Sequence, residues 1–171
     1  LDTVLGPILR MLAEETGLAR VALSRVDWVS EEVVILAGHG LTPAEVRRGR
    51  YAFGEGIIGR VVQSGQARVV PSIAAEPHFL DRTGALTEGT DRAFICVPIL
   101  LDGQVVGALS AYRSPAPPDE LGVDLDLLAI LAGLTAPAVQ QIATPQRVST
   151  HHNSPWRPPH MIGSSRVMMS V

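Results

Sequence analysis

The stretch AFICVPILLDGQVVGALSAY, residues 93–112, decides the fold. It consists of two apolar runs, 93–101 and 104–112, that are joined by Asp102-Gly103. Asp-Gly between two such runs is the strongest short-range signal for a β-hairpin. We therefore expect an antiparallel pair of strands.

Alternation along the first of these strands assigns its side chains to two faces. Phe94, Cys96 and Pro98 fall on one face, and Ile95 and Val97 share the other with Ile99. A cysteine in such a run is usually a small, inert hydrophobic residue. A redox-sensing or chromophore-binding role for Cys96 is the less favoured alternative.

The elements around this hairpin follow from periodicity and from stop signals. The pattern predicts a helix over 3–16, strands over 21–28 and 32–37, a short helix starting at Thr42, a helix over 56–64, a short strand over 67–70 and a last helix over 119–142. The order helix, hairpin, helix, strand, hairpin, helix predicts an α+β domain, with an antiparallel sheet and helices packed on it, over residues 1–143. Residues 144–160 are polar and Pro-rich, so we expect a disordered interdomain linker there, and residues 161–171 are expected to begin a second, truncated domain.

Composition excludes several classes of function. All 14 basic residues are Arg, so a Schiff-base lysine or a P-loop lysine is absent from these 171 residues. A net charge of -3 does not favour a nucleic-acid surface. One cysteine cannot form an internal disulfide or a multi-thiolate metal site, and no metal site is expected. The uncharged run 127–139 is shorter than a membrane span, so we expect a cytoplasmic protein without membrane contact.

The segment Gly54-Glu55-Gly56-Ile57-Ile58-Gly59 matches G-x-G-x-x-G literally. A dinucleotide site would need a buried strand before it, and a P-loop would need Lys where Arg60 stands. We therefore interpret Gly54, Gly56 and Gly59 as structural glycines that shape a tight turn into a helix lying close to the sheet.

Residues 72–91 have no sustained period, and connections of this length are usually functional or carry short helical turns. An arginine here could hold a carboxylate over an apolar floor. The competing interpretation is an ordinary polar loop in which Phe79 only packs against the edge of the hydrophobic core. The candidate ligand-pocket residues are His78, Phe79, Arg82, Thr83, Arg92, Phe94 and Cys96, and no residue is assigned a catalytic role.

Four segments together resemble a GAF domain: residues 53–61, 69–73, 94–99 and 103–109. Residues 76–84, EPHFLDRTG, further resemble the NifA-type activators of nitrogen-fixation genes. Residues 161–168 resemble the start of the AAA+ ATPase domain of sigma-54-dependent activators.

The resemblance implies a non-enzymatic sensor domain of a transcription activator. Family members respond to nitrogen or redox status through a small effector such as 2-oxoglutarate, through a PII-type signalling protein, or through a NifL-like regulator. It also implies that ATP, Mg²⁺, sigma-54 RNA polymerase and upstream DNA are bound by domains outside this chain, which itself has no expected cofactor. The motifs of cyclic-nucleotide, bilin and iron–sulfur GAF domains are absent.

Two further expectations concern an alternative function and self-association. The alternative function is a stand-alone redox enzyme on the same fold, resembling the free methionine sulfoxide reductases, for which Cys96 would have to act as the nucleophile. The helices over 3–16 and 121–142 are apolar on more than one face, so we expect a homodimer through them.

Overall fold

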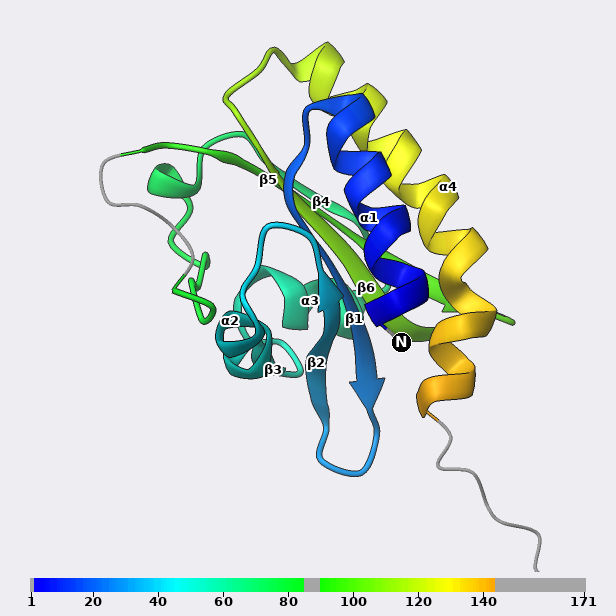
Figure 1. Ribbon diagram of the computed structural model, residues 1–171. Coiled ribbons are helices and arrows are strands. Elements are labelled where there is room, and N and C mark those ends of the chain that lie inside the picture. Colours follow the sequence, from blue (N-terminus) through cyan, green and yellow to red (C-terminus); the bar gives the residue numbers. More distant parts are fainter. Residues whose placement is uncertain (1, 85–89, 144–171) are drawn as a thin grey trace, which may run out of the picture.

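The computed structural model describes residues 2–84 and 90–143 (Figure 1). The elements in chain order are α1 (Asp2–Thr16), β1 (Ala19–Asp27), β2 (Glu32–Gly38), α2 (Pro43–Arg48), β3 (Arg50–Ala52), α3 (Gly56–Ser64), β4 (Arg68–Val70), the 3₁₀ turn η1 (Ile73–Ala75), β5 (Ala93–Leu101), β6 (Gln104–Arg113) and α4 (Pro118–Ala143). Six strands form one sheet in the order β3-β2-β1-β6-β5-β4, with every neighbouring pair antiparallel. The α+β prediction is confirmed.

Strands β5 and β6 form the hairpin that the sequence predicts, and β6 is one of the two central strands of the sheet. Leu101 pairs with Gln104 across the turn. Asp102 and Gly103 have φ values of 50° and 79°. Positive φ at both central residues is the type I′ geometry, whose twist matches that of the flanking strands.

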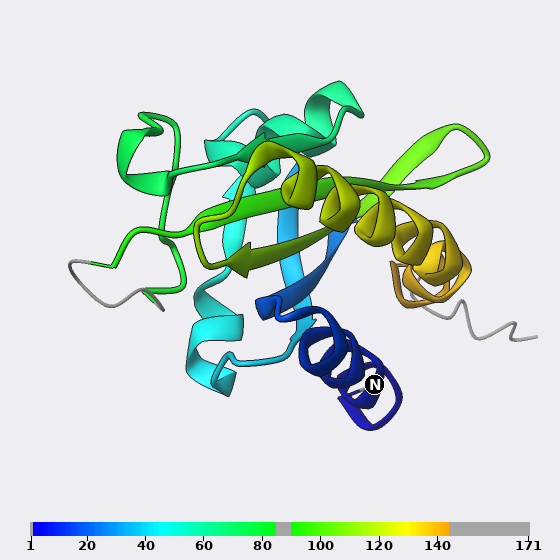
Figure 2. The ribbon, with the colours of Figure 1, turned by 90° about the horizontal axis from the view of Figure 1, so that it is seen from above.

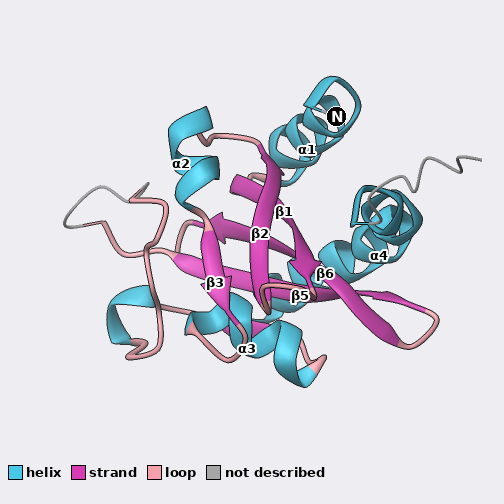
Figure 3. Cartoon of the chain, turned by 90° about the horizontal axis from the view of Figure 1, so that it is seen from below, coloured by secondary structure: helices cyan, strands magenta, loops and turns pink. Residues whose placement is uncertain are grey.

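The two faces of the sheet carry two separate cores. The side chains of Ile95, Val97 and Ile99 pack under α1 and α4, where Leu9 and Leu128 meet them. Phe94 and Cys96 pack on the opposite face with α3. Figures 2 and 3 show α1 and α4 together on one side of the sheet and α3 on the other. The alternation predicted for β5 is confirmed.

Local signals set the ends of the helices. Thr42 and Glu45 form a reciprocal capping box at the start of α2, with Pro43 at the first helical position. Gly65 ends α3 in the left-handed conformation at φ 67°. The short turn η1 falls within the aperiodic segment, where the sequence predicts short helical turns.

Strand β3 was not predicted. It has only three residues and follows the charged run Arg47-Arg48-Gly49, so it shows no period. Tyr51 alone faces the core, between two exposed neighbours. The predicted linker over 144–160 and the predicted second domain over 161–171 lie outside the described residues.

Helix α4 extends beyond the uncharged run 127–139 at both ends. Over Pro118–Ile142 it is long and apolar enough, by length and composition alone, to cross a membrane. One such helix is a weak indication, because a core helix of a soluble domain has the same character. Here Leu121, Leu128, Ala132 and Val139 are buried against the sheet, so α4 belongs to the domain's core.

Candidate ligand site

The loop after η1 crosses the face of the sheet that α3 covers, and Phe79 is its anchor. The Phe79 ring meets Phe94 at 5.6 Å and Tyr112 at 6.1 Å between centroids, edge to face in both pairs. Phe94 and Tyr112 lie side by side at 5.0 Å. Edge-to-face packing of this kind adds to the stability that burial of the rings provides. The loop is therefore held to the sheet by an aromatic cluster.

A small cavity lies inside this cluster, with a free volume of about 10 Å³, room for about one water molecule. Its walls come from β3, α3, the loop and the strands β5 and β6. The lining residues are Tyr51, Ile57, Ile58, Phe79, Leu80, Phe94 and Tyr112. A larger ligand can enter only if the loop moves and withdraws Phe79.

The ionisable groups of this face are held neutral. Burial raises the pKa of Tyr51 and of Tyr112 above the usual phenol range, and the negative charge of nearby Asp81 adds to both shifts. Burial likewise raises the pKa of the Cys96 thiol. The cavity therefore offers neutral phenols and rings. The Cys96 thiol, buried on the same face of the sheet, does not readily form the nucleophilic thiolate.

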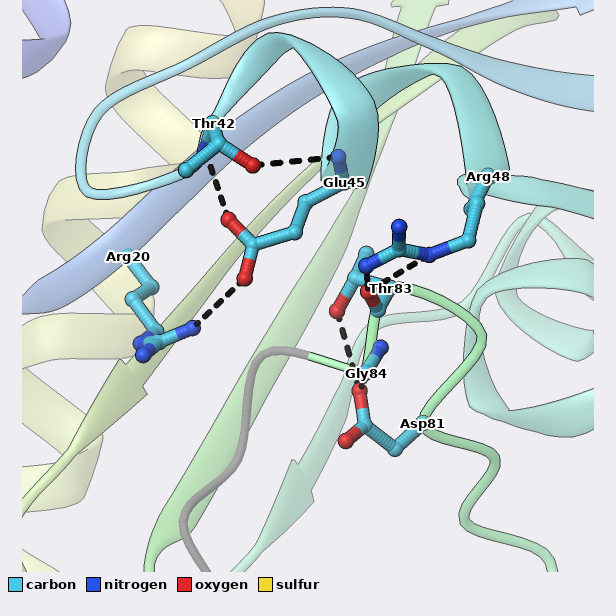
Figure 4. A network of polar contacts seen from close by, with 7 residues as sticks. All are labelled: Arg20, Thr42, Glu45, Arg48, Asp81, Thr83 and Gly84. Atoms are coloured by element: carbon cyan, nitrogen blue, oxygen red, sulfur yellow. Dashed lines mark hydrogen bonds and ion pairs between the residues drawn. The ribbon is translucent and has the colours of Figure 1, made fainter.

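Two arginines fasten the loop to the rest of the domain. Arg48, at the end of α2, donates from Nε to the carbonyl of Thr83 at 3.1 Å and also donates to it from Nη2 (Figure 4). Arg82 forms an ion pair with Glu55, the residue before α3. The amide of Ala52 donates to Glu55 at 2.9 Å, and this bond, followed by the one from Arg82, lowers the pKa of the Glu55 carboxyl.

The predicted pocket residues do not all converge. Phe79, Phe94 and Cys96 share the aromatic face, whereas Thr83 is buried and donates its hydroxyl to Asp81 at 2.9 Å. Arg82 is paired with Glu55, as described above. Arg92 lies apart, with Nη1 donating to Ser114 Oγ at 3.4 Å and no place in the walls of either described cavity.

His78 contacts α3 through Arg60. Its ring Nδ1 accepts from Arg60 Nη2 at 3.2 Å, since arginine can only donate. The two lie in the lining of a second cavity, of about 100 Å³, between α3 and β4.

The glycine segment forms the close approach to the sheet that its spacing suggests. Gly54 and Gly56 adopt φ values of 78° and 60°. A Cβ on Gly59 would lie 2.2 Å from the carbonyl oxygen of Ala52, so only glycine fits there without movement. The Glu55 carboxylate, paired with Arg82, lies beside the start of α3, where a phosphate would bind in a nucleotide loop.

Sequence reasoning missed the residues that act through distant contacts. Tyr51, Tyr112, Ile57 and Ile58 complete the cavity wall, and Arg48 fastens the loop. Alternation in β6 could have placed Tyr112 beside Phe94. No local signal pairs Arg48 with Thr83, which lies 35 positions further along the chain.

Known proteins resemble this chain in sequence and in fold. It is 37% identical to the nitrogen fixation protein VnfA of Azotobacter vinelandii over 185 aligned residues, and 32% identical to AnfA of the same organism over 183. Both alignments include 100% of this chain but only 35% and 34% of the relative, so the chain spans about a third of their length. A Nif-specific regulatory protein of Azospirillum lipoferum is 34% identical over 82% of the chain and 23% of its own length.

Solved structures give the same fold. The GAF domain of A. aeolicus nlh2 in an inactive state matches with a TM-score of 0.68, 21% identity and coverage of 81% of this chain and 83% of the other. The free methionine-R-sulfoxide reductase of Neisseria meningitidis, solved with its substrate, matches with a TM-score of 0.62 and 25% identity. The match covers 80% of this chain and 77% of the other. This enzyme is a neighbour in fold; the single cysteine of the present chain is fully buried and lacks the accessible thiolate that such chemistry uses.

The model of the family described as "GAF domain" matches residues 1–139. It thus includes the whole sheet, the aromatic cavity with its loop, and nearly all of α4. With this match over most of its length, the chain belongs to the GAF domain family.

Proposed function

We propose that this chain is the N-terminal regulatory domain of an activator of nitrogen-fixation genes. The observation that carries the proposal is the 37% identity to VnfA over the whole of the chain. In this proposal the domain senses a signal and does no chemistry. Domains outside the chain would hydrolyse Mg-ATP, contact sigma-54 RNA polymerase and bind upstream DNA in the cytoplasm.

The signal would reach the domain through the loop that Phe79 anchors. With the cavity nearly filled, the loop can lie over the sheet or lift from it, and an effector shifts the balance only if it binds one arrangement better. The proposed effectors are 2-oxoglutarate, a PII-type signalling protein or a NifL-like regulator. A metabolite would act by binding under the loop or beside it, and a protein by docking on its outer side.

Helix α4 would carry the change onward. It packs on β5 and β6, and Arg113 at the end of β6 forms ion pairs with Asp124 and Glu120 of this helix. Phe94 and Tyr112 belong to the same two strands. A movement of these rings therefore reaches α4 through the sheet itself.

A promoter assay tests the role of the domain. The full-length parent is expressed with a reporter under a nitrogenase promoter, in nitrogen-rich and nitrogen-poor cells. Deletion of residues 1–143 is expected to abolish the dependence on nitrogen status or to abolish activation. Phe79→Ala is expected to change that dependence at equal protein level, and Val29→Ala on the far turn serves as the control. The proposal would be refuted if neither the deletion nor Phe79→Ala altered reporter expression in nitrogen-rich or nitrogen-poor cells.

Calorimetry on the chain separates the two kinds of signal. Heat on titration with 2-oxoglutarate, lost in Phe79→Ala, would support a metabolite under the loop. Absence of heat, together with retention of the chain by an immobilised PII-type protein, would support a protein partner.

A further inference from the structure

The second cavity, between α3 and β4, has the composition of an anion site. We define the groove by its lining: Ile57, Arg60, Arg68, Val69, Val70, Glu76 and His78. It has a free volume of about 100 Å³, enough for a carboxylate or a phosphate group. Its apolar lining consists of isoleucine and valine, and its cationic lining consists of Arg60 and Arg68.

The two guanidinium groups of the groove have no carboxylate partner. Within residues 2–84 and 90–143, five other arginines form ion pairs, but no acid lies within 4.0 Å of Arg60 or Arg68. Glu76 lines the same groove, and one of its carboxylate oxygens accepts from the backbone amide of His78 at 3.0 Å. With two arginines against one carboxylate, the groove keeps a net positive charge.

One donor of Arg60, a residue of the groove lining, lacks an acceptor. Arg60 Nε is buried and has no hydrogen-bond partner among the described residues, while its Nη2 donates to His78. A buried guanidinium N–H without an acceptor costs free energy, and arginine cannot lose its proton to relieve that cost. A turn of the Arg60 side chain toward the groove would expose this N–H, and an oxyanion bound there would supply the missing acceptor.

We propose that the groove between α3 and β4 binds the oxyanion group of a small metabolite, a carboxylate or a phosphate, through Arg60 and Arg68 with His78 beside them. This site is separate from the aromatic cavity, although Ile57 lines both. Neither arginine carries a carboxylate partner that the anion would have to displace.

Occupation of the groove would also fix the loop. His78 and Phe79 are neighbours in the chain, the first in the lining of the groove and the second in the aromatic cluster. An anion that orders Arg60 and His78 therefore keeps Phe79 packed against Phe94 and Tyr112. The proposal deepens the sensing role described above and rests on it, since it gives the loop a ligand on its outer side.

Binding to the intact 171-residue chain tests the proposal. Inorganic phosphate and succinate are titrated separately at constant ionic strength with chloride as balance, and backbone amide shifts are followed by NMR. We expect saturable shifts at Val69, Val70 and His78 with at least one probe, and the stronger probe identifies the class of anion. Arg60→Gln and Arg68→Gln are each expected to weaken binding about tenfold, as for loss of one charge-assisted hydrogen bond.

Arg47→Gln is the matched control. It removes the same charge from an exposed residue of α2, which packs on β2, four strands away from β4. It is expected to leave the affinity within about twofold of the original chain. Phosphate or succinate should also slow exchange of the Phe79 amide in the original chain but not in Arg60→Gln.

Two results would overturn the proposal: no shifts beyond those caused by chloride, or equal binding by the original chain and both groove variants. The promoter assay is independent of this test. Binding in the groove without any effect of the domain on the reporter would keep the site and reject the proposed function, and the reverse outcome would reject the site alone.

Discussion

Cys96 shows how a strand position determines the chemistry of a side chain. The residue is 0% exposed on the α3 face of the sheet, and burial raises the pKa of its thiol. The thiolate is the reactive form, and forming it here would place an uncompensated charge in an apolar core. The buried surroundings of Cys96 therefore determine how reactive its thiol is.

We predict that the thiol does not react with a disulfide reagent while the chain is folded, even at pH 9, where an exposed thiol is largely ionised. Full labelling is expected only in denaturant. The chain has a single cysteine, so the amount of coloured thiolate that the reagent releases measures the reaction of Cys96 alone. Cys96→Ala should keep the response of the parent in the promoter assay. Stoichiometric labelling of the folded chain, or sulfoxide reduction that is lost in Cys96→Ala, would revive the redox alternative.

We predict that the same substitution, glycine to alanine, changes the free energy of unfolding in opposite directions at two helical positions. A Cβ added at Gly59 would lie 2.2 Å from the carbonyl oxygen of Ala52. A Cβ added at Gly133 in α4 would have no neighbouring atom within 4 Å. Gly59→Ala must push α3 away from β3 and is expected to lower the free energy of unfolding by about 1–3 kcal/mol. Gly133→Ala is expected to raise it by about 0.5–1 kcal/mol, because alanine has the better helix propensity.

Urea unfolding of the two variants beside the original chain measures both signs. The pair is self-controlled, since the chemical change is identical and only the surroundings differ. If Gly59→Ala were as stable as Gly133→Ala, the close approach of α3 to the end of β3 would not exist in solution.

At the scale of elements, an exposed ion pair is one of the contacts that hold the loop over the aromatic cluster. Glu55 and Arg82 join the start of α3 to the loop, and the side chains are 29% and 49% exposed, so solvent screens the pair. We expect Glu55→Gln or Arg82→Gln to cost below about 1 kcal/mol and to speed amide exchange at Phe79 and Gly84 up to about fivefold.

The sign of the pH effect follows from the pKa of Glu55. Its carboxyl has a lowered pKa in the folded chain, so the pair contributes fully above the ordinary value of 4.5 and is lost as pH falls through the lowered value. The difference in unfolding free energy between the original chain and Glu55→Gln should therefore shrink in acid. Arg50→Gln, which breaks an exposed ion pair between β3 and β2, should leave exchange in the loop unchanged. A difference that grows in acid would contradict this account.

Sequence could predict the elements whose signals are local. The turn Asp102-Gly103, the capping box at Thr42 and the alternation in β5 each lie within a few positions, and all three match the structure. Strand β3 escaped prediction because three residues cannot show a period. In the site, Phe79 and Phe94 could be predicted as apolar partners. The ion pair of Arg82 could not, since it spans 27 positions of chain.

At the scale of the whole molecule, α4 carries two apolar stripes. One, with Leu121, Leu128 and Val139, is buried against the sheet. The other runs along the opposite side through Val123, Ile130 and Leu134. Helix α1 lies on the same face of the sheet, with Ile8 and Met11 also exposed (Figures 2 and 3). An exposed apolar stripe such as that of α4 is typical of an interaction site.

We propose that this surface forms the homodimer that the helix patterns predicted. Ile130 and Leu134 lie one turn apart and are 63% and 74% exposed, so each would be covered by the partner copy in an isologous contact. Ile130→Arg with Leu134→Arg places two cations in that contact and is expected to convert a dimer to a monomer. Val29→Arg, at a residue 97% exposed on the β1–β2 turn, adds the same group elsewhere and should leave the dimer intact. Light scattering on the three proteins at equal concentration measures the mass. A monomeric original chain at high concentration, or a dimer that survives both arginines, would show that something other than a second copy covers α4.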